Sequence, residues 1–87
     1  MEVLLTPIEV VATFTQDGRI SPVRFRILRP DFGNETFFIH QITRRQRQRL
    51  GKKLIDIYTC KGRVQDYDRI FELKHEIHSG RWFLYRI

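Results

Sequence analysis

Hydrophobic and polar residues alternate along two stretches near the start of the chain. This period of two is the pattern of β-strands that bury one face. The apolar positions are Ile8, Val10, Ala12 and Phe14 in residues 8–15, then Val23, Phe25 and Ile27 in residues 23–27. The chain therefore predicts two strands in its first third.

The dipeptide Asp17-Gly18 separates these strands and is the strongest short-range signal of a β-hairpin, because a type I′ turn needs positive φ at both central residues. A two-residue loop places Val10 opposite Phe25, so the turn and the apolar register agree. Pro22 lacks an N–H and is expected at an edge or a bulge. The same register pairs Glu9 with Arg26, Val11 with Arg24, Ala12 with Val23, and Gln16 with Arg19.

The middle of the chain predicts one strand between two irregular segments. Residues 29–34 are rich in turn-forming residues and predict a loop, and residues 36–42 predict a strand that is apolar on both faces. Residues 43–53 break the alternation. Thr43 with Gln46 fits a helix capping box, but the arginines there oppose the helix dipole, so a short helical turn and a basic loop remain alternatives.

The last third predicts strands over residues 54–64, 71–77 and 81–87, with Gly62 as a bulge in the first of them and a turn at residues 65–67. Residues 78–80 predict a three-residue loop with Gly80 in the left-handed position. That loop places Ile77 opposite Arg81 and His75 opposite Phe83.

Short strands, tight turns and little helix indicate one all-β domain over residues 1–87. We expect a small antiparallel barrel of five to six strands with at most one short helical turn. An SH3-like barrel is favoured, and an OB-like barrel or an open sheet is the alternative.

Charge adds a candidate partner. The sequence has 16 basic and 10 acidic residues, a formal net charge of +6, and most of its basic residues are arginines. Arginine's planar guanidinium suits phosphate and stacks on bases, and a basic protein attracts polyanions. Nucleic acid or another polyanion is therefore the expected partner.

Compartment and membrane association follow from what the sequence lacks. Cys60 is the single cysteine, so no internal disulfide forms, although small secreted domains usually depend on several. The sequence shows no signal-peptide pattern and no apolar run of membrane-spanning length. We expect a cytoplasmic protein with no membrane partner.

Two groups of cations are candidate contacts to nucleic acid. The first is a dense basic segment without acids, which suits a phosphate backbone, although a solvated loop that aids solubility is the alternative interpretation. The second lies on the outward face of the first hairpin, where an ion pair between Glu9 and Arg26 is the alternative. Their members are Arg44, Arg45, Arg47, Arg49, Lys52 and Lys53, and then Arg24 and Arg26.

Tyr58, Tyr67 and Trp82 are the aromatic residues expected to be exposed and to stack on bases. For each of them a place in the core is the alternative interpretation.

No pattern indicates catalysis, a cofactor or a metal site. His75 and His78 match no common zinc signature. A cysteine nucleophile needs a nearby histidine, and a lone cysteine such as Cys60 is more often a buried apolar residue. The protein is expected not to be an enzyme.

Several strand and turn motifs resemble those of a family of short, uncharacterised proteins of Gram-positive bacteria. The resemblance implies a cytoplasmic bacterial domain and no particular activity. The motifs are Pro7-Ile8-Glu9-Val10, Asp17-Gly18, Arg24-Phe25-Arg26-Ile27, Phe71-Glu72-Leu73-Lys74 and Trp82-Phe83-Leu84-Tyr85.

The sequence thus favours a nucleic-acid-binding module. The alternative is a protein-interaction domain or accessory subunit, which would bind a protein partner or a second copy through a sheet edge or the last strand.

Overall fold

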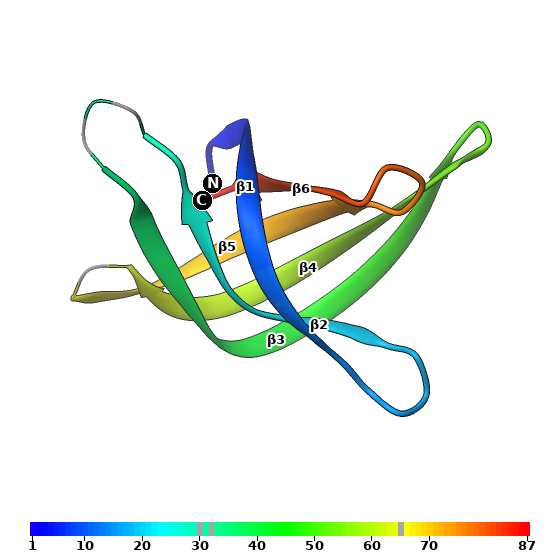
Figure 1. Ribbon diagram of the computed structural model, residues 1–87, viewed down its shortest axis with the longest axis horizontal. Helices are drawn as coiled ribbons and strands as arrows, with labels where there is room; N and C mark the ends of the chain where they lie inside the picture. Colours follow the sequence, from blue (N-terminus) through cyan, green and yellow to red (C-terminus); the bar gives the residue numbers. More distant parts are fainter. Residues whose placement is uncertain (30, 32, 65) are drawn as a thin grey trace.

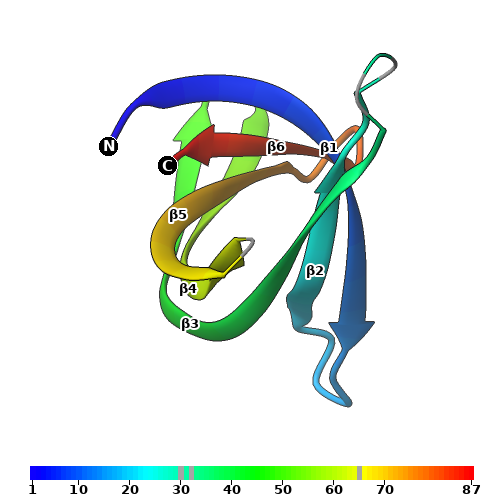
Figure 2. The same cartoon turned by 90° about the vertical axis from the view of Figure 1, so that its left-hand side faces the viewer.

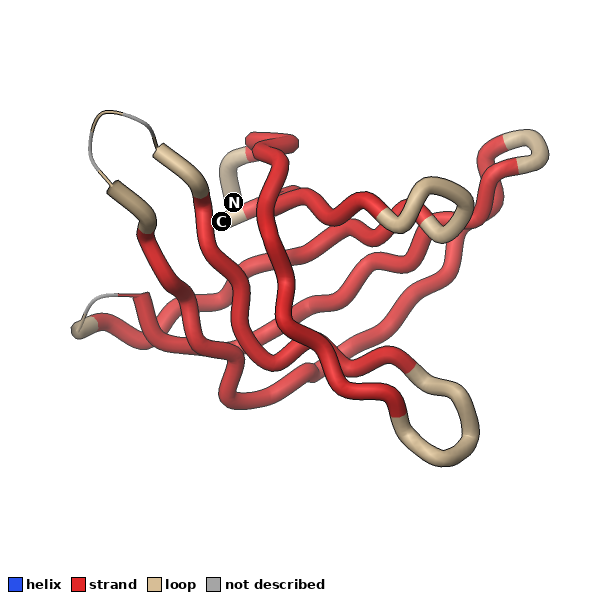
Figure 3. Tube along the Cα trace, in the orientation of Figure 1, coloured by secondary structure: helices blue, strands red, loops and turns tan. Residues whose placement is uncertain are grey.

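Six antiparallel strands make up most of the computed structural model, which describes residues 1–29, 31, 33–64 and 66–87. The strands are β1 (Val3–Phe14), β2 (Ile20–Ile27), β3 (Glu35–Leu50), β4 (Lys53–Val64), β5 (Tyr67–Glu76) and β6 (Arg81–Arg86). Strands cover nearly the whole trace, as Figure 3 shows, and no helix occurs in the described residues. Within these residues, no helix is long and apolar enough to cross a membrane.

Each strand pairs with its neighbours in sequence, and β1 also pairs with β6, which closes the barrel (Figures 1 and 2). The expected small antiparallel β-barrel is confirmed. The open sheet is wrong, and the up-and-down order differs from the Greek-key order of an OB-fold. The two loops predicted at residues 29–34 and 65–67 include Pro30, Phe32 and Gln65, which lie outside the described residues.

The first hairpin keeps its predicted register around Val10 and Phe25, but its turn is longer than predicted. Thr15 N–H donates to the carbonyl of Arg19 at 3.0 Å, so the loop has three residues, with Gly18 at φ 85°. Ala12 pairs with Pro22, and not with Val23 as predicted.

A bulge at Val23 adds a residue to β2 and compensates for the longer loop, so Val10–Phe25 and Glu9–Arg26 still pair. Pro22 lies at this bulge, as predicted. Phe14 is 74% exposed and does not join the core, because the end of this hairpin extends away from the packed barrel (Figure 1).

The largest correction concerns residues 43–53, which form neither a helical turn nor a basic loop. Pairing between β3 and β4 continues to Leu50 and Lys53, with only Gly51 and Lys52 between the two strands. Strand pairing satisfies the backbone whatever the side chains are, and every side chain of residues 43–50 is exposed. No apolar alternation was therefore needed here.

The predicted bulge at Gly62 is also wrong, because the extra residues are in β3, at His40 and Thr43. Gly62 pairs regularly, at a point of close approach. A Cβ atom at Gly62 would overlap the carbonyl oxygen of Phe38 and lie 3.0 Å from the Phe71 ring. The chain needs glycine here for space.

The last hairpin has a four-residue loop, Ile77–Gly80, and not the predicted three-residue loop. Glu76 pairs with Arg81, and His75 pairs with Trp82. Gly80 has a φ of 73°, as expected, and its N–H donates to the carbonyl of Glu76 at 2.9 Å. The one-residue difference turns Trp82 inward and Phe83 outward.

Three phenylalanines form the centre of the core. The ring of Phe25 stacks on Phe37 at 4.6 Å between centroids, and Phe71 meets Phe25 edge-on at 5.4 Å. The cluster also contains Ile27, Tyr58, Cys60, Val64, Leu73 and Leu84. Strands β2 to β6 all contribute residues to this core. Their packing fixes the positions of the strands whose outer faces carry the charged residues.

Candidate nucleic-acid interface

The second half of β3 and the first half of β4 form a two-stranded arm, which comprises residues 43–60. Its tip projects from one end of the barrel (Figure 1), and the molecule measures 36 × 25 × 23 Å. Alternation divides the basic residues of the arm between two faces. Arg45, Arg47 and Arg49 pair with Tyr58, Asp56 and Leu54, whereas Arg44 pairs with Thr59 on the other face.

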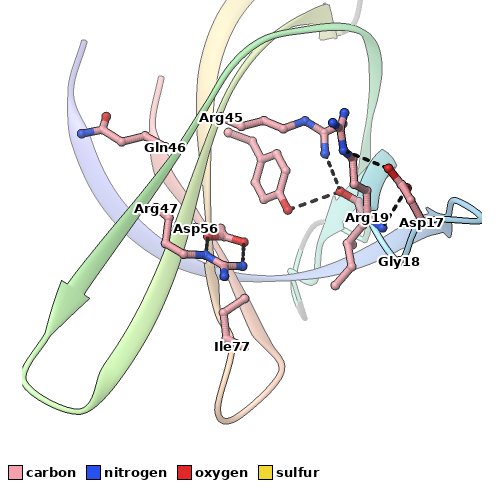
Figure 4. Close-up of a pocket in the computed structure, with 10 residues that line it drawn as sticks. Asp17, Gly18, Arg19, Arg45, Gln46, Arg47, Asp56 and Ile77 are labelled. Atoms are coloured by element: carbon pink, nitrogen blue, oxygen red, sulfur yellow. Dashed lines mark hydrogen bonds and ion pairs between the residues drawn. The ribbon is translucent and has the colours of Figure 1, made fainter.

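Arg45 fastens the arm to β2. Its Nη1 donates to the carbonyl of Ile20 and its Nη2 to Oγ of Ser21, both at 3.0 Å. Its guanidinium lies 5.5 Å from the centroid of the Tyr58 ring, and the Tyr58 hydroxyl donates to the same Ile20 carbonyl at 3.3 Å (Figure 4). The donors of Arg45 are therefore directed into the protein.

Arg47 is neutralised within the arm. Its Nε and Nη2 donate to the two carboxylate oxygens of Asp56 at 2.8 and 3.1 Å, a bidentate pair (Figure 4). These hydrogen bonds raise the pKa of Arg47 above its usual value. Because Asp56 satisfies this guanidinium, Arg47 is a poor candidate for a phosphate contact.

The two arginines line an open cleft of about 420 Å³ between the arm and the first hairpin (Figure 4). Arg19 also lines this cleft and pairs with Asp17 at 3.4 Å, so Arg45 is the lining cation whose charge no carboxylate in the described residues balances. Such a cleft has little net charge and does not suit a polyanion.

Four cations of the arm remain available. Within the described residues, no carboxylate lies within ion-pair distance of Arg44, Arg49, Lys52 or Lys53. All four are exposed; Lys52 lies in the turn beside Gly51, and Lys53 begins β4. The basic segment thus separates into anchoring residues at its base and free cations along its outer face and tip.

The second group of candidates also divides. Arg26 makes the ion pair that was its alternative interpretation, with Nε and Nη2 each 2.7 Å from Oε2 of Glu9. Arg24 is exposed and forms no ion pair with a described residue. Its cross-strand partners are Val11 and Phe38.

The stacking candidates differ in exposure. Tyr58 is only 3% exposed, so the expectation that it lies at the surface is wrong; Arg45 and Trp82 pack against its ring. Burial raises the pKa of its hydroxyl. Trp82 is half-buried and stacks on His75 at 4.0 Å. Tyr67, at the start of β5, is 71% exposed.

One residue of interest was not among the sequence candidates. Phe38 is 50% exposed on the outer face of β3, directly between Arg24 on β2 and Arg63 on β4. The sequence signal for Phe38 was the predicted strand over residues 36–42, which is apolar on both faces. A closed barrel buries only one face of a strand, so an apolar residue on the other face stays exposed.

Cys60 has the surroundings of a structural residue. It is fully buried in the core, and burial raises the pKa of its thiol to about 12. Its Sγ lies 3.7 Å from the carbonyl of Tyr58. A thiol with this pKa carries almost no thiolate near neutral pH, which is the form that reacts.

No protein-family model matches the sequence, and no curated protein or solved structure is significantly similar to it. The resemblance to short proteins of Gram-positive bacteria and the SH3-like assignment therefore stay predictions.

Proposed function

We propose that this protein is a non-enzymatic, cytoplasmic nucleic-acid-binding module that contacts the phosphate backbone with its β3–β4 arm. The observation that carries the proposal is the set of exposed, unpaired cations on that arm. These cations are Arg44, Arg49, Lys52 and Lys53.

The distribution of ion pairs supports this proposal. Arg19, Arg26, Arg29, Arg47, Arg63 and Arg86 each pair with an Asp or Glu. The excess positive charge of the chain therefore lies with its other cations, several of which gather on the arm. Neutralising phosphates with such cations releases condensed counterions, which favours binding at low salt.

The shape of the arm is also suitable. A two-stranded antiparallel ribbon is narrow enough to lie along a nucleic-acid groove or strand. Gln46 and Gln48 share the outer face with Arg44 and can donate hydrogen bonds to phosphate or sugar oxygens. Such contacts position a backbone without reading its sequence.

Fluorescence anisotropy with labelled single-stranded RNA, single-stranded DNA and duplex DNA tests the proposal. The variant Arg49→Gln/Lys52→Gln/Lys53→Gln removes three free cations from the tip. We expect measurable binding by the wild type at about 50 mM salt and a much weaker complex for the variant. Each lost phosphate contact should reduce the slope of log affinity against log salt by about 0.7 for single strands.

Arg29→Gln/Lys74→Gln/Arg81→Gln is the matched control, since it changes the net charge equally at residues outside the arm. This control should keep most of the salt slope. Equal losses in both variants would show that only net charge matters and would contradict a site on the arm. Absence of wild-type binding at low salt would refute the proposal altogether.

A homodimer through a sheet edge has less support. Beyond Phe38, β3 has a paired strand on one side only. Pairing this edge with a second copy would bring like-charged arginines together, and charged side chains are a common protection against edge pairing. The residues concerned are Arg44, Arg45, Arg47 and Arg49.

A further inference from the structure

Phe38 is a large apolar side chain that folding leaves in water. It lies on the outer face of β3, near the middle of the sheet formed by β2, β3 and β4. Phe38 is 50% exposed, whereas Phe37 is 3% exposed and belongs to the core. Packing of the barrel therefore does not explain why residue 38 is aromatic.

Cationic side chains flank Phe38 on both neighbouring strands. Arg24 and Arg63 are its direct cross-strand partners, and such partners have Cβ atoms about 4.5–5.5 Å apart. Arg24 forms no ion pair with a described residue. Arg63 meets Asp68 at 3.5 Å, but both side chains are more than half exposed, so water and salt screen this pair.

The ring of Phe38 is open, unlike the rings of Phe83 and Tyr85 on the outside of the barrel. The guanidinium of Arg81 covers Phe83 at 5.1 Å, and that of Arg86 covers Tyr85 at 4.6 Å. No cation of the described residues stacks over Phe38 in this way. Its face is free to receive another flat group.

Open hollows adjoin Phe38 on both sides along β3. One, of about 340 Å³, is lined by Thr36 together with Glu9, Arg24 and Arg26. The other, of about 400 Å³, begins at His40 and is lined further by Lys61, Gly62, Asp68, Arg69 and Ile70. Cations outnumber carboxylates around the ring, which suits an anionic chain that crosses the strands.

We propose that Phe38, with Arg24 and Arg63, forms a stacking site for an unpaired base of a single-stranded nucleic acid. The inference rests on the proposed function and names its substrate class. A base stacks on the open ring while the guanidiniums meet the adjoining phosphates. A duplex keeps its base faces inside the stack, so this site distinguishes single strands from duplexes.

The test compares Phe38→Leu with wild type in anisotropy titrations against labelled oligouridine of about 12 nucleotides, within the site sizes of small barrels. Leucine keeps an apolar side chain and removes the π-face. The variant should bind roughly 5- to 150-fold more weakly, in keeping with the loss of one stacked base, with an unchanged salt slope. Phe14→Leu, at an exposed ring in another part of the barrel, should bind as wild type does.

An abasic strand of equal length separates stacking from charge, because it keeps the phosphates and lacks the bases. On that strand, wild type and Phe38→Leu should bind equally. Wild-type affinity of Phe38→Leu for oligouridine would overturn the stacking site and leave the arm proposal standing. A change in self-association without a change in oligouridine binding would also overturn it and assign this face to a protein contact.

Discussion

At the residue scale, the immediate neighbours of His75 determine its protonation. The imidazole is buried, stacks nearly parallel on the indole of Trp82, and has no hydrogen-bond partner at Nδ1 in the described structure. Burial lowers the pKa of His75, because the charged ring would lose its hydration; the nearby carboxylate of Asp56 opposes this effect to a smaller extent. His75 is therefore a neutral ring within an aromatic stack.

This lowered pKa predicts a pH-dependent stability. Below the ordinary value of 6.5, the unfolded state binds a proton that folded His75 does not bind, so the free energy of unfolding decreases as the pH falls. This loss of stability develops as the pH falls from 6.5 to the folded-state pKa of His75, and it is absent above pH 6.5. His75→Phe keeps an aromatic ring beside Trp82 and should lose less stability between pH 8 and pH 5.5 than wild type.

Urea denaturation at the two pH values measures the difference. His78→Phe is the control, since His78 is exposed in the last turn. It should retain the wild-type dependence. If His75→Phe and wild type lose equal stability on acidification, His75 is not the titrating group.

At the scale of elements, β3 determines how the charged surface is arranged. Each of its bulges, at His40 and Thr43, reverses the faces of the residues that follow, so the two together restore the original faces and shift the register against β4 by two residues. After the second bulge, Arg45 and Arg47 share the face of Tyr58 and Asp56, where they form the contacts at the base of the arm. Without the two bulges these arginines would keep that face, but Arg45 would oppose Asp56 and Arg47 would oppose Leu54.

Close packing at Gly62 holds β3 against β4 near the first bulge. Gly62→Ala should lower the free energy of unfolding by about 1–3 kcal/mol, as overpacked sites do, because a backbone oxygen of β3 must move. For a domain of this size, each kcal/mol lowers the melting temperature by roughly 4–8 °C. Thermal unfolding followed by circular dichroism provides the measurement.

Gly51→Asn is the comparison, because nothing lies within 4 Å of a Cβ at Gly51 and asparagine tolerates its φ of 63°. It should unfold close to the wild-type temperature. Equal melting temperatures for Gly62→Ala and wild type would show that β3 and β4 do not need this close approach.

At the scale of the whole molecule, β6 closes the barrel by pairing with both β1 and β5. Its Leu84 is 1% exposed and sits opposite Leu73 in the common core. Closure buries one face of each strand on a shared centre and leaves the other face for charge and for Phe38. Since each part of the wall packs on the same core, the barrel is expected to unfold as one unit.

Leu84→Ala tests this dependence on closure. Truncation of a fully buried leucine should lower the free energy of unfolding by about 2–5 kcal/mol while leaving one cooperative transition. Leu50→Ala makes the same chemical change at the exposed end of β3 and should change stability by less than about 0.5 kcal/mol. Two separate transitions in Leu84→Ala would contradict a single cooperative barrel.

Local patterns were sufficient for much of the fold. Alternation located the strands, and the glycines at positions 18 and 80 marked turns, because positive φ is a property of the residue itself. The cross-strand pairs Val10–Phe25 and Glu9–Arg26 were predicted correctly from the apolar face, although the loop is one residue longer than predicted and a bulge at Val23 compensates for it. The basic segment was visible as a charge cluster.

Loop lengths, bulges and the route of the arm did not follow from local patterns. The last loop differs from the prediction by one residue, which exchanges the inner and outer faces of β6. The arm has exposed residues on both faces of β3, so it gave no periodic signal. Its strand conformation comes from hairpin pairing with β4 across the turn at Gly51 and Lys52, which the side-chain pattern did not reveal.

The sequence by itself determined an all-β domain with an excess of arginine, since composition and alternation are local quantities. Only the tertiary structure decided that β1 meets β6, that Arg45 and Arg47 have partners inside the protein, and that Phe38 faces water between two arginines. The physical reason is that burial and charge pairing depend on which distant strands become neighbours. That choice is made by the packing of the whole barrel.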